Sequence, residues 1–173
     1  MRKLNKRILN VGCGNDTYGT HFIDLYPSRK EVIKCDVDKE KFPFPSNYFD
    51  EVFSRNLIEH LTNPSNFLKE SYRVLKKGGK IIVITDNASY WVWAVSKTHH
   101  GGYRIYENVQ GRHYQLFTPE HLINYLKKFG FRKIKWKFIR HSDNLIVSLI
   151  DFFLTITPFS RMGFKRIKII ATK

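Results

Sequence analysis

The sequence is poor in cysteine and in acidic residues, and it has no long apolar run. Its two cysteines, Cys13 and Cys35, are too few for a disulfide framework, which favours a reducing, cytoplasmic location. The longest apolar stretch, residues 145–157, contains Asp151 and is shorter than the roughly 20 residues that span a bilayer. We therefore expect no transmembrane segment, and we interpret this stretch as a buried or substrate-facing helix in preference to an interfacial membrane helix. Only a short apolar run follows the basic N-terminus, so no signal peptide is expected either.

A metal site is not expected. Four histidines lie close together in the chain: His99, His100, His113 and His121. Their spacing matches no structural zinc pattern, and no cysteine pair accompanies them.

The shortage of acids leaves a strong positive charge. Thirty lysines and arginines against fifteen acidic residues give a formal net charge of +15. Such a field attracts nucleic acid, anionic lipid headgroups or phosphorylated metabolites. The alternative is a lysine-rich, solvated surface without a specific partner, and the charge itself does not choose between them.

Aromatic residues, in contrast, are plentiful. The chain has fourteen Phe, nine Tyr and three Trp in 173 residues, enough large apolar side chains for one sizeable core. Repeats, low-complexity tracts and linker-like stretches are lacking, so residues 1–173 are expected to form one domain.

The hydrophobic pattern predicts alternating strands and helices. The expected strands are residues 7–11, 20–25, 31–37, 49–54, 80–85, 131–139 and 164–172. One helix is expected from Pro64 to Lys77 with Asn63 as its cap, and a second from Pro119 to Gly130 with Thr118 as its cap. This order is typical of an α/β doubly wound sheet.

Small and acidic residues follow the first three strands. Gly12 and Gly14 come after the first strand, and Asp24 and Asp36 end the second and third. In a parallel sheet the ligand lies at the carboxyl ends of the strands, where strand order reverses. Glycine allows close backbone approach there, Asp24 can accept hydrogen bonds from ribose hydroxyls, and Asp36 can accept one from an adenine amino group.

Three further segments accompany these residues. A Phe-Pro-Phe-Pro segment at 42–45 leads to Phe49-Asp50, an EHL segment occupies 59–61, and FTPEHL occupies 117–122. Together the motifs resemble the class I S-adenosylmethionine-dependent methyltransferases, in particular the methyltransferase type 11 branch. The closer match is a subgroup whose first motif is Leu-Asn-x-Gly-Cys-Gly, here residues 9–14.

The resemblance implies S-adenosylmethionine as cofactor. It also implies a Rossmann-like, mostly parallel seven-stranded sheet with the last strand antiparallel. The expected cofactor-binding residues are Asn10, Gly12, Cys13, Gly14, Asn15, Asp24, Leu25, Asp36, Val37, Arg55 and Asn56. Cys13 is interpreted as a small packing residue of the cofactor turn and not as a nucleophile.

Two departures from the family pattern concern the first motif. Asn10 stands where most members carry Asp, and Asp16 replaces the usual third glycine. Nine residues separate Gly14 from Asp24, too few for a full crossover helix, so we expect the first helix to be abbreviated to a turn. A more exposed cofactor face, covered by a partner subunit or a second copy in a homo-oligomer, is a hypothesis that follows.

The acceptor side is less defined. Residues 87–114 are expected to form a substrate-covering insertion, because they follow the fifth strand and are rich in aromatic residues. The candidate bases are His113, His60 and Tyr114, with Asp86 behind them. We expect methyl transfer to a small-molecule or lipid-like substrate.

Two alternatives to that function stay open. The first is an RNA or tRNA methyltransferase that uses the basic surface. It is weakened because no Asn/Asp-Pro-Pro-Tyr or Pro-Cys segment follows the fourth strand. The second is a non-catalytic, cofactor-binding partner subunit, since no base is clearly assigned.

Overall fold

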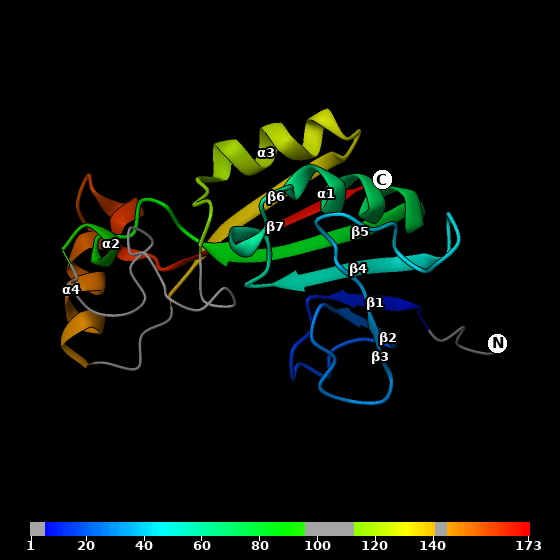
Figure 1. Cartoon of the computed structure of the whole chain (residues 1–173). Helices are drawn as coiled ribbons and strands as arrows, with labels where there is room; N and C mark the ends of the chain where they lie inside the picture. The colour runs from blue at the N-terminus through cyan, green and yellow to red at the C-terminus, as the bar shows by residue number, and fades with distance from the viewer. Residues whose placement is uncertain (1–5, 96–112, 141–144) are drawn as a thin grey trace.

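A seven-stranded sheet organises the chain (Figure 1). The computed structural model describes residues 6–95, 113–140 and 145–173. The strands are β1 (Ile8–Val11), β2 (His21–Asp24), β3 (Val32–Lys34), β4 (Phe49–Arg55), β5 (Leu75–Asp86), β6 (Arg132–Ile139) and β7 (Arg166–Thr172). Their order in the sheet is β3-β2-β1-β4-β5-β7-β6. β1 to β5 pair in parallel, and β7 runs antiparallel between β5 and β6. The predicted α/β sheet with an antiparallel last strand is confirmed.

The strand order reverses at β1, which lies between β2 and β4. Parallel pairing therefore brings the carboxyl ends of β1, β2, β3 and β4 to one edge of the sheet. Leu9, Ile23 and Val52 on these strands are fully buried and fix the register from the core side. A ligand site is expected at this edge.

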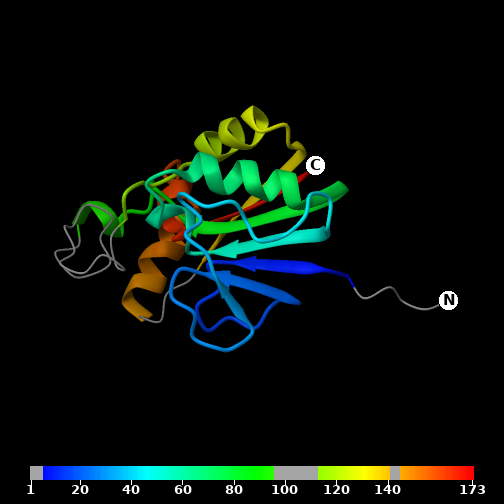
Figure 2. The same cartoon turned by 45° about the vertical axis from the view of Figure 1, so that its right-hand side comes forward.

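Two helices cover one face of the sheet (Figures 1 and 2). α1 (Pro64–Val74) and α3 (Pro119–Lys128) contact each other, and α3 also contacts β6 and β7. Each helix buries an apolar stripe at helical spacing, with Phe67 and Leu68 on α1 and Leu122 and Leu126 on α3. The remaining short elements are η1 (Ile58–His60), α2 (Val92–Val95), α4 (Leu145–Thr155) and η3 (Ser160–Gly163).

The first crossover is a turn, as expected from its length. Residues 12–20 between β1 and β2 contain no helix, and neither do the links from β2 to β3 and from β3 to β4. All three links lie in the described range 6–95, so α1 is the first α-helix of that range.

α1 begins at Pro64 as predicted, but its C-terminal end and its cap differ from the prediction. The helix ends at Val74 and not at Lys77, because buried Leu75 takes an extended conformation and pairs with Phe49 of β4. Asn63 makes no side-chain cap; its amide donates to the Asp38 carbonyl 3.2 Å away. The cap at Thr118 of α3 is confirmed, since its hydroxyl accepts from the His121 amide.

The third strand is also shorter than predicted. β3 ends at Lys34, and the Cys35 amide makes a last bond to the Asp24 carbonyl at 2.9 Å. The chain then turns, because the Lys39 and Glu40 amides both donate to the carbonyl of Asp36. Asp36 consequently lies in a turn beyond the sheet edge.

The apolar stretch 145–157 is a helix, but it is not buried. Within α4 the one buried residue is Asp151, whereas Leu149, Phe152 and Phe153 are exposed. The buried interpretation is therefore wrong, because the polar side of this helix faces the protein. No helix among the described residues is long and apolar enough to cross a membrane.

Candidate functional site

A cavity of about 540 Å³ lies at the carboxyl edge of β1 to β4. Its walls come from the segments that follow these four strands and from the chain just before α3. The lining residues are Gly12, Gly14, Asp24, Leu25, Tyr26, Cys35, Asp36, Val37, Asp38, Lys39, Asn56, Leu57, His60, Leu61, Thr62 and Tyr114. The strand order alone predicts this location, because it is where the sheet changes direction.

The two glycines of the first turn have different tasks. Both have positive φ, +66° at Gly12 and +48° at Gly14, a region that most side chains avoid. A Cβ on Gly12 would lie 2.6 Å from a methyl of Leu57, so the Leu57 side chain would have to shift to admit one. A Cβ on Gly14 would meet nothing within 4 Å and would project into open space. Gly14 therefore leaves room for a ligand, whereas Gly12 leaves room for Leu57.

Asp24 connects the turn to the second strand. Its two carboxylate oxygens accept from the backbone amides of Gly14 and Tyr26, each at 2.8 Å. A carboxylate has about four acceptor positions, so two amide bonds leave capacity for ligand hydroxyls. Asp24 thus holds the cavity wall and also presents negative charge to the cavity.

Side chains from the β2–β3 link complete this support. Ser28 donates to the Gly14 carbonyl at 2.9 Å, and Arg29 reaches the Asp16 carbonyl at 3.2 Å. Arg55 at the end of β4 forms a 2.8 Å ion pair with the Asp16 carboxylate. These contacts fix the turn in place of the missing crossover helix.

The third wall is a turn of acidic residues after β3. The Asp36 carboxylate accepts from the Asp38 amide at 3.1 Å and pairs with exposed Lys39 at 3.2 Å. Asp38 accepts from both the amide and the hydroxyl of Thr62, at 2.9 and 2.7 Å. Val37 is buried between these acids and supplies an apolar surface to the cavity. The turn can therefore offer a ring both an acceptor and a packing surface.

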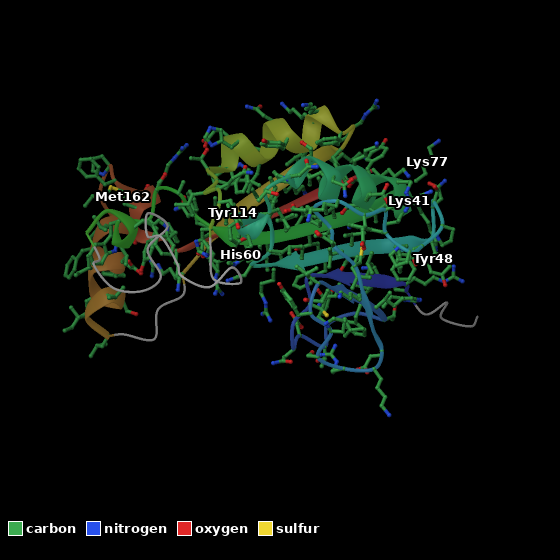
Figure 3. The ribbon with its side chains drawn as sticks, in the orientation of Figure 1. Lys41, Tyr48, His60, Lys77, Tyr114 and Met162 are labelled. Atoms are coloured by element: carbon green, nitrogen blue, oxygen red, sulfur yellow. The ribbon has the colours of Figure 1, made fainter. Side chains whose placement is uncertain are left out.

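Two aromatic side chains lie at the mouth of the cavity. Figure 3 shows His60 and Tyr114 near each other at the carboxyl edge, with Tyr48 at the opposite end of the sheet. The amide of Tyr114 donates to the Glu59 carbonyl at 2.9 Å, which ties the chain before α3 to η1. The His113 ring packs edge-on against His60, with centroids 4.7 Å apart. The three candidate bases from the sequence are thus neighbours.

A buried carboxyl, that of Glu59, lies next to His60 in the chain. Glu59 is fully buried, and one of its oxygens accepts from the Thr85 hydroxyl at 2.7 Å. Burial, reinforced by the nearby charge of Asp86, raises the pKa of Glu59 to about 7. The group is therefore close to half-protonated at neutral pH.

Of the eleven expected cofactor-binding residues, seven line the cavity and four do not. The seven are Gly12, Gly14, Asp24, Leu25, Asp36, Val37 and Asn56. Asn10 is buried, and its amide donates to the Tyr18 carbonyl at 3.0 Å. Arg55 pairs with Asp16, and Asn15 is exposed outside the lining. Cys13 packs in the core, and burial raises the pKa of its thiol, which suits a packing residue better than a nucleophile.

Several lining residues escaped the sequence analysis. They are Tyr26, Cys35, Asp38, Lys39, Leu57, Leu61 and Thr62. Tyr26 and Asp38 directly follow the predicted Leu25 and Val37 and could have been found by extending each motif by one residue. Leu57 and Thr62 reach the cavity through η1 and the loop after it, for which the sequence has no periodic signal.

Part of the expected insertion lies outside the described residues, namely residues 96–112 with His99 and His100. Among the residues described, no group of three potential ligands could hold a metal ion. His121 is exposed on α3, away from the cavity lining.

Comparison with known proteins identifies relatives of this chain. A family model described as a methyltransferase domain matches residues 2–135. The chain is similar to 2-methyl-6-phytyl-1,4-hydroquinone methyltransferase of Spinacia oleracea, with 30% identity over 122 residues, 68% of this chain and 31% of that protein. It is also similar to a ubiquinone/menaquinone biosynthesis C-methyltransferase of Nitrosospira multiformis, with 29% identity over 106 residues, 47% of this chain and 43% of that protein. The chain spans less than half the length of these two relatives.

A solved structure extends the likeness to nearly the whole fold. A SAM-dependent methyltransferase from Archaeoglobus fulgidus superposes with a TM-score of 0.68 at 19% identity. The superposition covers 97% of this chain and 86% of that one. At this identity the match concerns the fold, which is the sheet order and edge described above.

Proposed function

Since the chain belongs to the methyltransferase-domain family, whose cofactor is S-adenosylmethionine, we propose that it transfers the methyl group of this cofactor to a small, lipid-like acceptor. The observation that carries the proposal is the cavity at the carboxyl edge, bounded by Gly14, Asp24 and Asp36. Gly14 and the two acids that we assign to ribose and adenine line one space there.

The residues present fit the cofactor. The open space at Gly14 accommodates the methionine portion close to the backbone. Asp24 keeps acceptor capacity for the ribose hydroxyls, and Asp36 with Val37 offers an acceptor and a packing surface to adenine. Asn10 is not assigned to the methionine end, because its amide is already bonded inside the turn.

The chemistry of the bound cofactor is displacement of a methyl group from a sulfonium. For such a reaction the protein mainly orients the acceptor and excludes water. Asn56 and His60 line the cavity beside the turn and bound the space in which an acceptor would lie. His60 and Tyr114 are the groups placed to take a proton from a hydroxyl acceptor, and His113 contacts His60 from behind.

Two observations support a lipid-like acceptor. The cavity lies at the carboxyl edge of the sheet. Figure 1 shows α2 and α4, whose sequences VWAV and LIVSLIDFFLT are largely apolar, beyond the same end of the strands. The spinach relative is named for a hydroquinone with a phytyl chain, an acceptor that combines a ring with a long apolar tail. An apolar surface at the same end of the sheet suits such a tail.

Calorimetry of the purified chain tests the cofactor part. S-adenosylmethionine and S-adenosylhomocysteine are each expected to bind at one site, and absence of both heats would overturn the assignment. Methyl-labelled cofactor incubated with cell extract tests the acceptor. Label is expected in the organic-solvent fraction, and label confined to RNA or protein would overturn the lipid-like acceptor while leaving the cofactor site intact.

A further inference from the structure

α4 exposes its apolar side chains and buries its one acid, the reverse of an ordinary surface helix. Its outer side carries Leu145, Leu149, Phe152 and Phe153, at the spacing of one helical face, and Ile156 directly after the helix continues the row. Their exposed fractions range from 49% to 75%. A soluble helix normally shows its polar residues to water, so this arrangement places the apolar side where a partner would lie.

The inner side of the helix is fixed by polar contacts. Asp151 is 1% exposed, and its carboxylate accepts from the Trp91 indole at 2.7 Å and the Tyr90 hydroxyl at 3.3 Å. Gly163 of η3 approaches so closely that a Cβ there would lie 2.5 Å from the Asp151 carbonyl. These contacts set the rotation of α4 about its axis, so the outward apolar face is a consequence of specific bonds.

The apolar surface continues beyond the helix and has a basic border. Phe159, before η3, is 63% exposed and extends the outer face by another aromatic side chain. Arg140 lies 5.6 Å from the Phe152 ring centre and donates to the Thr155 hydroxyl at 2.7 Å. Arg161 of η3 is half exposed and forms a 2.8 Å ion pair with half-exposed Glu120 of α3. Arg140 is therefore the cation that directly borders the apolar face, and the acid of the helix itself is buried.

The charge argues against a second copy as the occupant. Two chains of net charge +15 would repel each other, and the outer face of α4 offers no exposed carboxylate to pair with the arginines of a partner. A surface that is apolar within and negative at its boundary would match both the apolar face of α4 and the positive charge of the chain. Interfacial helices bind such surfaces through buried apolar area together with attraction of basic groups to anionic lipids.

We propose that the outer face of α4, with Phe159 and Arg140 at its border, docks the protein on the surface of a membrane that contains anionic phospholipids. The helix lies in the interface and does not cross it, in keeping with its eleven residues. The carboxyl edge of the sheet then faces the bilayer, from which an apolar acceptor could enter. Docking itself needs neither cofactor nor turnover and is independent of the function proposed above.

Vesicle sedimentation with the full chain, without cofactor, tests the proposal. Sucrose-loaded vesicles of phosphatidylcholine with one quarter phosphatidylglycerol are compared with pure phosphatidylcholine vesicles. We expect at least tenfold stronger binding to the anionic vesicles at low salt and a marked loss of binding at high salt. Equal binding to the two vesicle types, or none to either, would overturn the proposal.

A triple variant separates the apolar face from the general charge. Leu149→Gln/Phe153→Gln/Ile156→Gln keeps the net charge and is expected to reduce binding to anionic vesicles at least tenfold. The matched control, Ile33→Gln/Trp136→Gln, removes exposed apolar side chains of the edge strands and is expected to bind like the wild type.

Thermal unfolding followed by circular dichroism checks that both variants fold, and sedimentation velocity reports their oligomeric state. A wild-type dimer that the triple variant converts to monomer, with vesicle binding unchanged, would show that the face is an interface between copies. That result would overturn the membrane proposal.

Discussion

Two regions at the carboxyl end of the sheet, the cavity edge and α4, are built on opposite principles. At the cavity edge, the segments after β1 to β3 are held by backbone hydrogen bonds to Asp24, Asp36 and Asp38, so polar groups define the walls. α4, none of whose residues lines the cavity, buries its one acid and exposes its apolar side. The first region tolerates little change because each contact fixes a backbone position, and the second should tolerate changes that leave its inner bonds intact.

The largest expected effect is for substitution of Gly12, in the turn after β1 at the cavity edge. Gly12→Ala would place a methyl 2.6 Å from Leu57 at a positive φ, and we expect a loss of about 3 kcal/mol in unfolding free energy. Denaturant unfolding measures it. Gly14→Ala is the matched control, because its Cβ meets nothing within 4 Å, and it should cost about 1 kcal/mol while weakening cofactor binding more than tenfold. Equal stability losses in the two variants would contradict the division of tasks between the glycines.

A second prediction concerns Glu59, the buried carboxyl next to His60. Because the pKa of Glu59 is raised in the folded chain, its ionisation opposes folding: stability is full below its unfolded pKa and falls as pH rises toward about 7. Glu59→Gln keeps an acceptor for Thr85 and removes the charge, so we expect it to stabilise the chain by about 3 kcal/mol at pH 8.

Denaturant titrations of wild type and Glu59→Gln at pH 5 and pH 8 measure the effect. The gain should fall to about 1 kcal/mol at pH 5, where the folded carboxyl is protonated and the unfolded carboxyl is only partly ionised. A gain that is the same at both pH values would mean that ionisation of Glu59 is not the cause.

The third prediction concerns Asp24, the acid that we propose to bind the ribose. Asp24→Ala should weaken S-adenosylmethionine binding by about 1–3 kcal/mol, through loss of charged hydrogen bonds and of the brace on Gly14. Calorimetry measures it. Asp50→Ala, at the opposite end of β4, removes an ion pair to Lys76 and should leave cofactor affinity unchanged. Unchanged affinity in Asp24→Ala would remove this residue from the ribose role.

The smallest expected effect is at α4. Phe153→Gln changes an exposed side chain without touching the bonds of Asp151, and we expect the unfolding free energy to stay within about 0.5 kcal/mol of the wild type. Asp151→Ala should instead destabilise the chain by about 2 kcal/mol, because it leaves the buried Tyr90 hydroxyl without this acceptor. If Phe153→Gln were the more damaging of the two, the helix would be packed through its apolar side after all.

The same contrast explains what the sequence could predict. Glycines and acids at strand ends are local signals, and parallel pairing gathers Gly14, Asp24 and Asp36 without further information. The rotation of α4 is not local, because its residues are apolar on nearly all sides and its orientation depends on bonds from Trp91. The failed cap at Asn63 is similar, since Asp38, distant in sequence, takes up its amide.

The hydrogen bonds of Asp24 affect the entropy that the protein loses when a ligand binds. The carboxylate already holds the amides of Gly14 and Tyr26, and Ser28 already holds the Gly14 carbonyl. The turn is therefore ordered before any ligand arrives, and association should lose little backbone conformational entropy at this wall. A short, braced turn can thus replace a longer helical crossover, because pre-organisation depends on how many bonds fix the chain and not on its length.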